Sequence, residues 1–590
     1  MLRTNNCNQL TEKNVGEKVE LCGWVHNRRD HGGIIFIDLR DHYGLTQIVF
    51  DPESSKKAHE AAEHVRSEWV LKVSGTVRKR GEGLANPKLN TGEIEVFITE
   101  LDILNSAKTP PFEIDEHLPN VREDLRLEYR YLDLRRPKMQ KNLKLRHQIS
   151  KSIRDYFDNN EFLEIETPIM VKGTPEGSRE YLVPSRLHRG EFYVLPQSPQ
   201  QLKQLLVLGG VDKYFQIARC FRDEDLRGDR QPEFTQFEIE MAFAEQEDIL
   251  NIIEGCFQEI TKKCVPAKDF AKYLQDGKFQ RLTWQEAMEK YGSDKPDIRF
   301  NLEFSNISDI AKNSGFGIFT NSTNLFALSV SKNLGTFSRK DIEELTKLAQ
   351  THGAGGLAWI RVGEDAGPVA KNSKQEFLDE LFKRTGAKDG DIIFFGASDD
   401  FITAVEPLGA VRSAVGDKLE LKKQGEFAYL WVTDFPMFEK KEDGSLGAAH
   451  HPFTRPNPKD VDKLKTDPTN VKSIAYDIVL NGVELGGGSI RIHDSKLQTE
   501  VFEALGMNPE EIQHKFGHLI KAFEYGCPPH GGCAMGLDRV IMMFADEPNI
   551  REVIAFPKNQ SAQDLMLGAP SAMPEKELNE QNITVLEEDE

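Results

Sequence analysis

Two neighbouring segments with a two-residue period constrain the fold most: YFQIARCFRDE at 214–224 and FTQFEIEMAFA at 234–244. In the second segment apolar and polar side chains alternate, as on a β-strand with two different faces. The apolar positions are Phe237, Ile239, Met241 and Phe243, and the polar ones are Gln236, Glu238 and Glu240. The charged segment between them, DLRGDRQPE, is too long for a tight hairpin. We expect a strand–loop–strand whose polar face is the floor of a site for a polar ligand.

A second β-rich region runs from residue 19 to about residue 104 and contains five short segments. They are VELCGWVHN, IIFIDLRD, LTQIVFD, WVLKVSGTVRKR and EIEVFITELDIL. Turn signals such as HGG, DHYG and TGE separate them. So many strands in so short a region predict a small barrel, and the exposed strand face of such barrels commonly binds oligonucleotides. A fragment of a β-sandwich is the alternative.

The segments after this region predict a linker and then a helix. Residues 105–120, NSAKTPPFEIDEHLPN, contain three prolines and little periodicity, which is typical of a linker. Apolar residues then follow at helical spacing on one face: Leu145, Ile149, Ile153, Tyr156 and Phe157. We expect this helix to end near Asn160, and FLEIETPIM to form a strand that Pro168 interrupts.

Residues from about 285 to 415 differ in composition from their surroundings. They contain stretches rich in serine and asparagine, the glycine cluster GAGGLAWIRV and the amphipathic segment RKDIEELTKLAQ. This change predicts an inserted domain. A further strand, AYDIVLNGVELGGGSIRIH, and an apolar helix, GLDRVIMMFA, are expected to complete the core.

Composition excludes several classes of protein. The 590 residues carry a net charge of −20, which argues against a protein that coats nucleic acid non-specifically. No apolar run approaches the ~18–20 residues of a membrane span, and MLRTNNCNQL lacks the layout of a secretory signal, so we expect a cytoplasmic protein without a membrane segment. Seven cysteines without a repeating frame predict reduced thiols. The terminal EKELNEQNITVLEEDE predicts a solvated acidic tail.

Several common catalytic motifs are absent from the sequence. There is no P-loop, no Rossmann fingerprint, no H-E-x-x-H and no G-x-S-x-G. Cys527, His530 and Cys533 lack a fourth ligand and have an atypical spacing, so a zinc site is disfavoured. A nucleotide, if one binds, must therefore bind in another way.

Arginines and acids near glycine-rich turns are the remaining candidates. The pairs are Arg222 with Glu224, Asp477 with Glu484, and Arg491 with Arg539. The planar guanidinium binds carboxylate and phosphate, and paired acids hold Mg²⁺ against phosphate oxygens. The set favours phosphoryl or nucleotidyl transfer. For any one pair taken singly, a structural ion pair is the alternative.

Three ordered segments resemble the motifs of a known family. FRDEDLRGDRQPEFTQFEIE resembles motif 2 of the class II aminoacyl-tRNA synthetases, GLDR at 536–539 resembles motif 3, and the segment ending at Pro168 resembles motif 1, the dimer-forming element. TPEGSREYLVPSR, QSPQQLKQLL, HHPFT and GVELGGGSIRIH are similar to the bacterial-type aspartyl-tRNA synthetases. The resemblance covers nearly the whole chain.

The resemblance implies an α+β multidomain enzyme. It has an N-terminal five-stranded OB-type β-barrel and an antiparallel-sheet class II catalytic domain with an inserted α+β domain. The expected divisions are an anticodon-binding domain at 1–106, a hinge at 107–140, the N-terminal portion of the catalytic domain at 141–284, the inserted bacterial-type domain at 285–415, the C-terminal portion of the catalytic domain at 416–560, and an extension with the acidic tail at 561–590.

The resemblance also implies an aspartate–tRNA ligase that forms aspartyl-adenylate from L-aspartate and ATP with Mg²⁺, and transfers aspartate to tRNA(Asp). The implied aspartate pocket is Glu176, Gln200, Lys203, Arg222, Glu238, His450 and Arg491. The implied ATP site is Arg222, Asp223, Glu224, Gln231, Glu484, Gly536, Leu537, Asp538 and Arg539, with Mg²⁺ near Asp477 and Glu484. Arg222 and Arg539 are the expected catalytic residues, and Glu238 stands where the family usually has Asp.

The implied tRNA contacts lie in the N-terminal region. The anticodon residues are Arg29, Phe36, Gln47 and Arg78. His31 and Gly83 are similar to the nondiscriminating subgroup, which charges both tRNA(Asp) and tRNA(Asn) with aspartate. A tRNA-dependent amidotransferase would then act on the product. The resemblance at motif 1 implies a homodimer.

Four alternatives remain open. The first is a strictly discriminating aspartyl enzyme, and the second is a sister enzyme for asparagine or lysine. Lys203 together with Arg491 favours an acidic substrate over that second possibility. The third is a non-catalytic tRNA-binding paralogue, and the fourth is an asparagine-synthetase-like enzyme that acts without tRNA.

Overall fold

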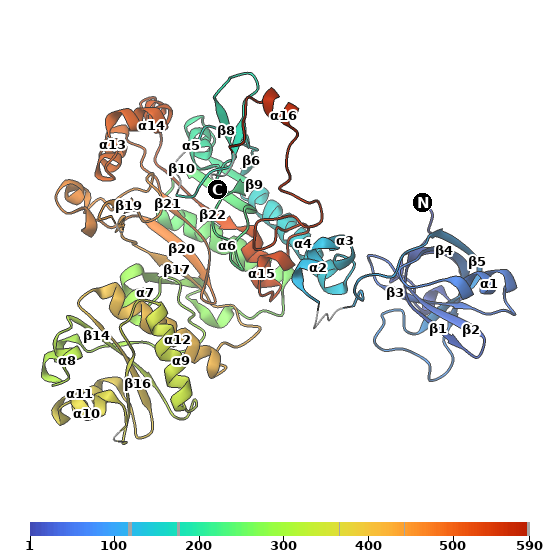
Figure 1. The fold of residues 1–590 in the computed structure, drawn as a ribbon, viewed down its shortest axis with the longest axis horizontal. Helices are drawn as coiled ribbons and strands as arrows, with labels where there is room; N and C mark the ends of the chain where they lie inside the picture. The colour runs from blue at the N-terminus through green and yellow to red at the C-terminus, as the bar shows by residue number, and fades with distance from the viewer. Residues whose placement is uncertain (116–120, 174–176, 365, 442, 587–590) are drawn as a thin grey trace. The chain divides into compact units, whose positions relative to one another are not determined.

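The computed structural model describes residues 1–115, 121–173, 177–364, 366–441 and 443–586 (Figure 1). Contacts divide the chain into two compact units. The first consists of Met1–Lys144 and Arg551–Ser571, and the second of Leu145–Ile550 and Ala572–Glu590. In the portion of the chain that the structure describes, no helix is both long and apolar enough to cross a membrane.

The first unit contains a closed five-stranded barrel with the order β1-β2-β3-β5-β4. Its strands are β1 (Lys18–His31), β2 (Ile34–Arg40), β3 (Leu45–Phe50), β4 (Val70–Lys79) and β5 (Ile94–Asn105), with helix α1 (Lys56–His64) after β3. Alternate residues such as Leu21, Ile37 and Ile98 are fully buried inside it. The strands pair antiparallel except β3 with β5, which are parallel. The predicted barrel is confirmed, and the sandwich fragment was wrong.

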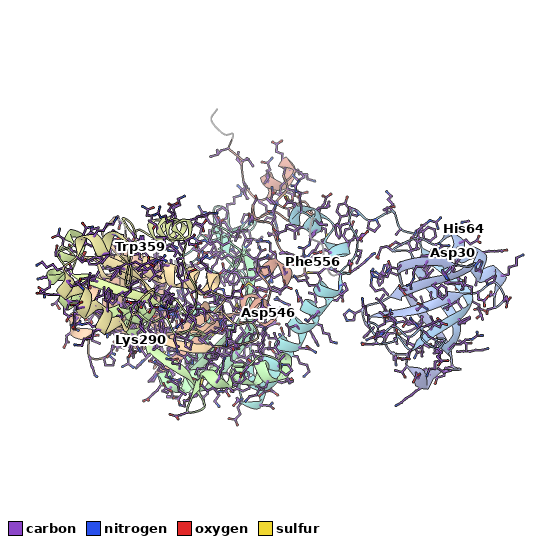
Figure 2. The ribbon with its side chains drawn as sticks, turned by 90° about the horizontal axis from the view of Figure 1, so that it is seen from below. Asp30, His64, Lys290, Trp359, Asp546 and Phe556 are labelled. Atoms are coloured by element: carbon purple, nitrogen blue, oxygen red, sulfur yellow. The ribbon has the colours of Figure 1, made fainter. Side chains whose placement is uncertain are left out.

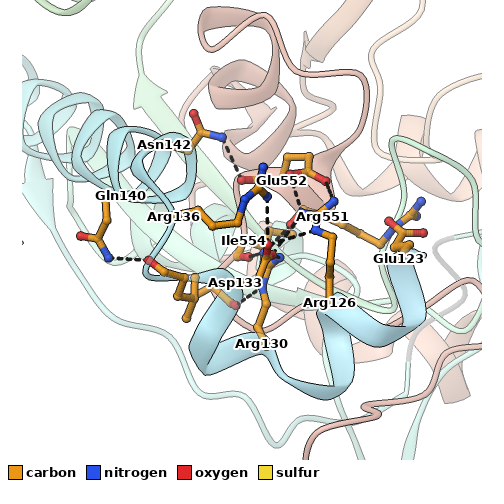
Figure 3. Close-up of polar contacts among 12 residues, drawn as sticks. Glu123, Arg126, Arg130, Asp133, Arg136, Gln140, Asn142, Arg551, Glu552 and Ile554 are labelled. Atoms are coloured by element: carbon orange, nitrogen blue, oxygen red, sulfur yellow. Dashed lines mark hydrogen bonds and ion pairs between the residues drawn. The ribbon is translucent and has the colours of Figure 1, made fainter. Parts of the chain in front are cut away.

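An ionic cluster ties two short helices of the first unit to its C-terminal segment. The helices are α2 (Glu123–Glu128) and α3 (Arg130–Asp133). The fully buried carboxylate of Asp133 pairs with Arg126, Arg130 and Arg136, and Arg126 also pairs with Glu552 at 2.9 Å (Figure 3). Because several cations share these two carboxylates, the pKa of Asp133 stays below its usual range although burial alone would raise it.

The second unit is built on a nine-stranded sheet with the order β11-β12-β17-β20-β21-β22-β10-β9-β6. The strands are β6 (Leu163–Glu164), β9 (Lys213–Phe221), β10 (Glu233–Ala242), β11 (Leu274–Gln275), β12 (Lys278–Thr283), β17 (Tyr429–Thr433), β20 (Ala475–Leu480), β21 (Val483–Ile490) and β22 (His530–Gly536). Neighbours are antiparallel except in the pairs β12–β17 and β6–β9. The predicted antiparallel sheet is confirmed, with a parallel pair towards each edge.

Helices and two small ribbons complete this unit. The helices are α4 (Pro137–Asn159), which begins in the first unit, α5 (Gln200–Leu208), α6 (Gln246–Cys264), α7 (Trp284–Tyr291), α13 (Ser495–Ala504), α14 (Pro509–Phe523), α15 (Leu537–Phe544) and α16 (Glu575–Glu580). The ribbons are β7 (Leu182–Pro184) with β8 (Phe192–Val194), and β18 (Phe438–Lys440) with β19 (Leu446–Ala448). Helix α4 buries Ile149, Ile153 and Phe157 completely, as its sequence predicts. The 3₁₀ helices are η1 (Glu12–Asn14), η2 (Ala271–Tyr273), η3 (Ser308–Asn313), η4 (Val461–Lys465), η5 (Pro468–Asn470) and η6 (Ile550–Glu552).

A separate four-stranded sheet forms within the stretch predicted to be an insertion (Figure 2, near the label Trp359). Its strands are β13 (Ser305–Asn306), β14 (Asn324–Val330), β15 (Ala358–Arg361) and β16 (Ile392–Ser398), in the order β13-β14-β16-β15. Its helices are α8 (Gly317–Thr320), α9 (Arg339–Thr351), α10 (Pro368–Asn372), α11 (Gln375–Thr385) and α12 (Phe401–Lys418). Alternate residues of β14 enter two different apolar clusters, so helices cover both faces of this sheet.

Three local expectations were wrong. Strand β10 ends at Ala242, so Phe243 is not on the apolar face but 72% exposed, with a φ of 54°. FLEIETPIM forms only the two-residue strand β6, since the chain leaves the sheet before Pro168. AYDIVLNGVELGGGSIRIH is not one strand but the hairpin β20–β21, which turns at Asn481 and Gly482.

Candidate active site

A cavity of about 970 Å³ opens over the polar face of the nine-stranded sheet. It is lined by many of the residues that the resemblance implies: Gln200, Arg222, Glu224, Gln231, His450, Asp477, Glu484, Arg491, Gly536, Asp538 and Arg539. The others differ in position. Lys203, Asp223, Glu238 and Leu537 do not belong to the lining, and Glu176 lies outside the described residues.

Glycines let the central strands approach closely below the cavity. A Cβ on Gly487 would lie 1.8 Å from Oδ1 of Asp477 on the neighbouring strand, and a Cβ on Gly488 would lie 2.0 Å from the carbonyl oxygen of Gly532. Real Cβ atoms do not approach other atoms so closely. The glycine run of β21 therefore leaves room for the Asp477 carboxylate at the cavity wall.

Two cations and two carboxylates form a buried cluster at one end of the site. Nζ of Lys203, on α5, lies 2.9 Å from Glu238 and 3.3 Å from Glu240, both on β10. The Arg491 guanidinium donates to both oxygens of Glu240, at 2.9 and 3.2 Å. All four side chains are at most 1% exposed. Such a cluster is stable only because its charges balance.

The two carboxylates of this cluster are not equivalent. Burial would raise the pKa of Glu240, but Arg491 and Lys203 hold it below its ordinary value. Glu238 has its ion pair with Lys203, yet neither of its oxygens accepts a hydrogen bond from a described residue. Glu238 is therefore less fully engaged than Glu240, although it does not line the cavity.

Histidines beside this cluster are held neutral. Burial lowers the pKa of His450 to about 4 and that of His451 well below its usual value. Nε2 of His451 lies 2.5 Å from a guanidinium nitrogen of Arg491, which can only donate, so this ring nitrogen accepts. His451 thus helps to hold Arg491 without adding charge.

Arginines dominate the other end of the cavity. Arg539, on α15, donates to the carbonyl oxygen of Glu484 at 2.7 Å and pairs with Asp229 at 3.0 Å. The Arg222 guanidinium lies over the ring of Phe234, 5.1 Å from its centroid. Among the described residues, no acceptor pairs with Nε of Arg222 or Nε of Arg539, although both atoms are buried. Donors without acceptors at a cavity wall suit an anionic ligand.

The loop between β9 and β10 covers this end. Besides the pair of Asp229 with Arg539, Arg230 of the same loop donates to Glu224 at 3.2 Å. Two charged residues of the loop therefore contact two of the predicted ATP-binding residues, Arg539 and Glu224.

Asp477 and Glu484 both line the cavity from the hairpin β20–β21, in which Asp477 pairs with Gly487 and Glu484 with Val479. Burial and the nearby Glu484 raise the pKa of Asp477 well above its usual value. A divalent cation would relieve this repulsion. Within the described ranges no group of three or more His, Cys, Asp or Glu side chains is arranged to hold a metal. Two carboxylates fit Mg²⁺, which commonly takes one or two of them together with substrate phosphates.

Asp538 lines the cavity but its carboxylate is already engaged. Oδ1 accepts from Arg146 of α4 at 2.5 Å, and Oδ2 accepts the backbone N–H of Thr235 at 2.8 Å. The side chain is 4% exposed.

The barrel brings the predicted anticodon residues of its first three strands onto one outer face. In register, Arg29 of β1 faces Phe36 of β2, and Asp38 of β2 faces Gln47 of β3. Arg29 pairs with Asp38 at 3.0 Å and donates to Gln47 at 3.3 Å, while Gln47 donates to Glu95 of β5 at 2.8 Å. Arg78 of β4 lies over the ring of Phe97, 4.0 Å from its centroid.

His31 is the exposed last residue of β1, and Gly83 lies in the exposed turn between β4 and β5. Gly83 has a φ of +77°, which disfavours any side chain, and a Cβ built there would meet no atom within 4 Å. The loop at this position therefore presents bare backbone to solvent.

Several residues of the site were not among the predicted ones. Glu240 shares the alternation of Glu238, and His451 follows His450, so the sequence contained a signal for both. Asp229 and Arg230 belong to the charged loop. Residues at the edges of the predicted insertion also line the cavity, and no motif marks them: Trp284, Asp294, Asp400, Ile402 and Glu406.

Sequence comparison identifies two families. The family described as tRNA synthetases class II (D, K and N) matches residues 122–560, and the OB-fold nucleic acid binding domain matches residues 19–104. An aspartate–tRNA ligase of Staphylococcus epidermidis is 49% identical over 99% of both chains. An aspartate–tRNA(Asp/Asn) ligase of Natranaerobius thermophilus is also 49% identical over 99% of both, and one of Bacillus cereus (strain AH187) is 50% identical over 98% of both.

Solved structures share the fold. The asparaginyl-tRNA synthetase of Pyrococcus horikoshii with bound asparaginyl-adenylate superposes with a TM-score of 0.59 at 18% identity, covering 94% of this chain and 98% of its own. An aspartyl tRNA synthetase from Entamoeba histolytica gives a TM-score of 0.56 at 18% identity, covering 93% and 90%.

Proposed function

Because this chain belongs to the class II tRNA synthetases of the D, K and N group, we propose that the cavity is where L-aspartate and ATP react. The chain acts as an aspartate–tRNA ligase: relatives of that name match it from end to end. The observation that carries the substrate assignment is the buried pair of Lys203 and Arg491 beside the cavity. It favours an acidic amino acid over asparagine or lysine.

The charge balance of the cluster gives a physical reason for this choice. Glu238 and Glu240 neutralise Lys203 and Arg491 within the protein itself. Aspartate brings a carboxylate for Lys203 and an ammonium group for Glu238, so every buried charge keeps a partner. Asparagine brings the same ammonium group but a neutral side-chain amide in place of the side-chain carboxylate, and one buried charge then stays unpaired. Sites of this kind discriminate by ~10⁴-fold or more.

Activation requires no protein nucleophile. The α-carboxylate of aspartate attacks the α-phosphorus of ATP in line, which gives aspartyl-adenylate and pyrophosphate. The barrier lies in bringing two anions together, so positioning and neutralisation carry the catalysis. Arg222 bridges the carboxylate and the α-phosphate, and Arg539 holds the γ-phosphate. Asp477 and Glu484 would hold Mg²⁺, and the ion would supply further neutralisation of phosphate oxygens. The remaining ATP contacts are assigned to Asp223, Glu224, Gln231, Gly536 and Leu537.

Transfer follows at the same site. The 3′-terminal hydroxyl of tRNA attacks the mixed anhydride and releases AMP. Gln200, His450 and Glu176 complete the amino-acid pocket in this assignment. The outer face of the barrel, with Arg29 and Phe36, binds the anticodon loop by stacking and phosphate contacts.

The experiment that tests this function is charging of pure tRNA(Asp) and tRNA(Asn) with labelled aspartate and with labelled asparagine. We expect aspartate, and not asparagine, on both tRNAs. Charging of tRNA(Asp) alone would show that the enzyme is strictly discriminating. Charging with asparagine would contradict the substrate assignment.

Asp229 is expected to compete with ATP for Arg539. Their ion pair, at 3.0 Å, must break before the γ-phosphate can bind. Asp229→Asn should therefore lower KM for ATP by about two- to fivefold in pyrophosphate exchange, since a half-exposed pair contributes ~1 kcal/mol or less. Asp225→Asn, in the same loop but outside the cavity lining, is the matched control. An unchanged or higher KM for ATP in Asp229→Asn would show that the pair does not compete.

A long side chain at position 83 is expected to make the enzyme discriminate between tRNA(Asp) and tRNA(Asn). The anticodons differ at their last base, and bare backbone there relaxes the contact. Gly83→Lys should lower kcat/KM for tRNA(Asn) about tenfold and change that for tRNA(Asp) less than about twofold. Gly16→Lys is the control for backbone strain, because Gly16 has a φ of +92° and is equally open. Equal losses for both tRNAs would contradict a role in discrimination.

We further propose a cytoplasmic homodimer. β6 is the edge strand of the nine-stranded sheet, and Leu163, Ile169 and Met170 nearby are each more than half exposed. An apolar sheet edge is suited to a second copy of the chain. Sedimentation equilibrium at micromolar concentration should give twice the chain mass, and a monomer there would contradict it. Aspartyl-tRNA(Asn) would require a tRNA-dependent amidotransferase.

A further inference from the structure

The Arg146 side chain of α4 joins this helix to two other elements of the second unit. It lies on α4, and its guanidinium donates to Oδ1 of Asp538 on α15 at 2.5 Å and to Oγ1 of Thr235 on β10 at 3.2 Å. Thr235 also accepts from Arg219 of β9 at 3.2 Å. One side chain of α4 thus contacts both the strand and the helix that line the nucleotide end of the cavity.

The strand register explains why Asp538 is needed at this point. The pairing of β10 with β22 reaches Gln236 and Gly536, after which α15 begins. The next N–H of β10, that of Thr235, has passed the end of β22, and Oδ2 of Asp538 accepts it at 2.8 Å. Asp538 therefore fastens the first turn of α15 to β10.

The next residue along α15 is Arg539, which holds the γ-phosphate in the proposed function. Its direction depends on how firmly that first turn is fixed. Asp538 is 4% exposed, and a buried carboxylate without its cation is strongly disfavoured. Arg146 supplies the cation.

We propose that Arg146 is a positioning residue for ATP: it fixes Asp538, and through Asp538 it holds the first turn of α15 so that the Arg539 guanidinium faces the triphosphate. The inference rests on the proposed role of Arg539. If Arg146 acts in this way, its loss weakens the binding of a ligand that has a γ-phosphate and leaves the binding of a ligand without one unchanged. A purely structural ion pair would weaken both alike.

The test compares how a substitution at Arg146 changes KM for ATP and the inhibition constant of AMP. For Arg146→Met we expect KM for ATP in pyrophosphate exchange to rise about tenfold. The inhibition constant of AMP and KM for aspartate should stay within about twofold. Arg146→Lys should restore some of the ATP effect, because lysine can reach one of the two acceptors but not both. Arg154→Met is the matched control: it lies on the same helix and pairs with the half-exposed Glu164 at 2.9 Å.

A double variant separates this inference from the proposed function. If Arg146 acts through Arg539, adding Arg146→Met to Arg539→Ala should change KM for ATP by less than about twofold. A full tenfold effect in that background, or equal losses for ATP and AMP in Arg146→Met, would overturn the inference. If Arg539→Ala alone binds ATP as wild type does, the role of Arg539 fails instead. If Arg146→Met does not fold, Arg146→Lys is used instead. The ratio of its KM for ATP to its inhibition constant for AMP, compared with the wild-type ratio, then decides the question.

Discussion

Arg222→Ala is expected to lower kcat/KM for aspartate-dependent pyrophosphate exchange by about 10³-fold. Arg222 lines the cavity over Phe234, and its buried Nε has no acceptor among the described residues. These are the properties of a preorganised group whose ligands arrive with the reaction, and loss of one such donor typically costs 10²–10³-fold. Two functions, binding the carboxylate and binding the α-phosphate, are lost together here.

Lysine should not rescue this position. Arg222→Lys keeps the charge but loses the planar fork that spans two anions, so we expect less than about tenfold recovery over alanine. Arg227→Ala, in the adjoining loop and outside the cavity lining, controls for a general effect on the loop. If Arg222→Ala exchanged pyrophosphate at the wild-type rate, Arg222 would have no role in the mechanism.

The second large effect is expected at Lys203. Lys203→Met should abolish aspartate activation and also lower the free energy of unfolding by about 3–5 kcal/mol. The reason for the instability is that Glu238 would stay fully buried without its cation, whereas Glu240 would keep Arg491. The urea midpoints of wild type and variant measure the stability, and pyrophosphate exchange measures the activity.

A double variant separates these two consequences. Lys203→Met with Glu238→Gln removes a cation and a carboxylate together, so most of the lost stability should return. Aspartate activation should not return, since the substrate carboxylate would still lack Lys203. Activity in the stable double variant would contradict the recognition of aspartate by this lysine.

The sequence predicted the elements of the site better than their surroundings. The alternation along β10 correctly placed Glu238 and Glu240 on one face. It could not show that this face would be buried as deeply as the apolar one, because that depends on Lys203 and Arg491, which come from α5 and from beyond β21. Burial of charge depends on partners that are distant in the sequence.

The errors have local physical causes. A left-handed residue at Phe243 ends β10 and turns the ring outward, and periodicity alone does not detect such a residue. The turn at Asn481 and Gly482 was present in the sequence as an asparagine–glycine pair, a strong hairpin signal. Because the residues on both sides of this pair are largely apolar, their pattern predicted one continuous strand. Residues such as Asp294 and Glu406 reach the cavity only through tertiary packing. The domain divisions and the individual ligand contacts stay predictions.

We propose that a balanced cluster of buried charges selects aspartate and that arginines let it meet ATP without a covalent enzyme intermediate. Exchange of labelled pyrophosphate into ATP by the pure protein, with each of aspartate, asparagine and lysine, tests it most directly. We predict exchange with aspartate and at least ~10⁴-fold less with asparagine. Exchange supported equally by asparagine, or none with aspartate, would contradict it.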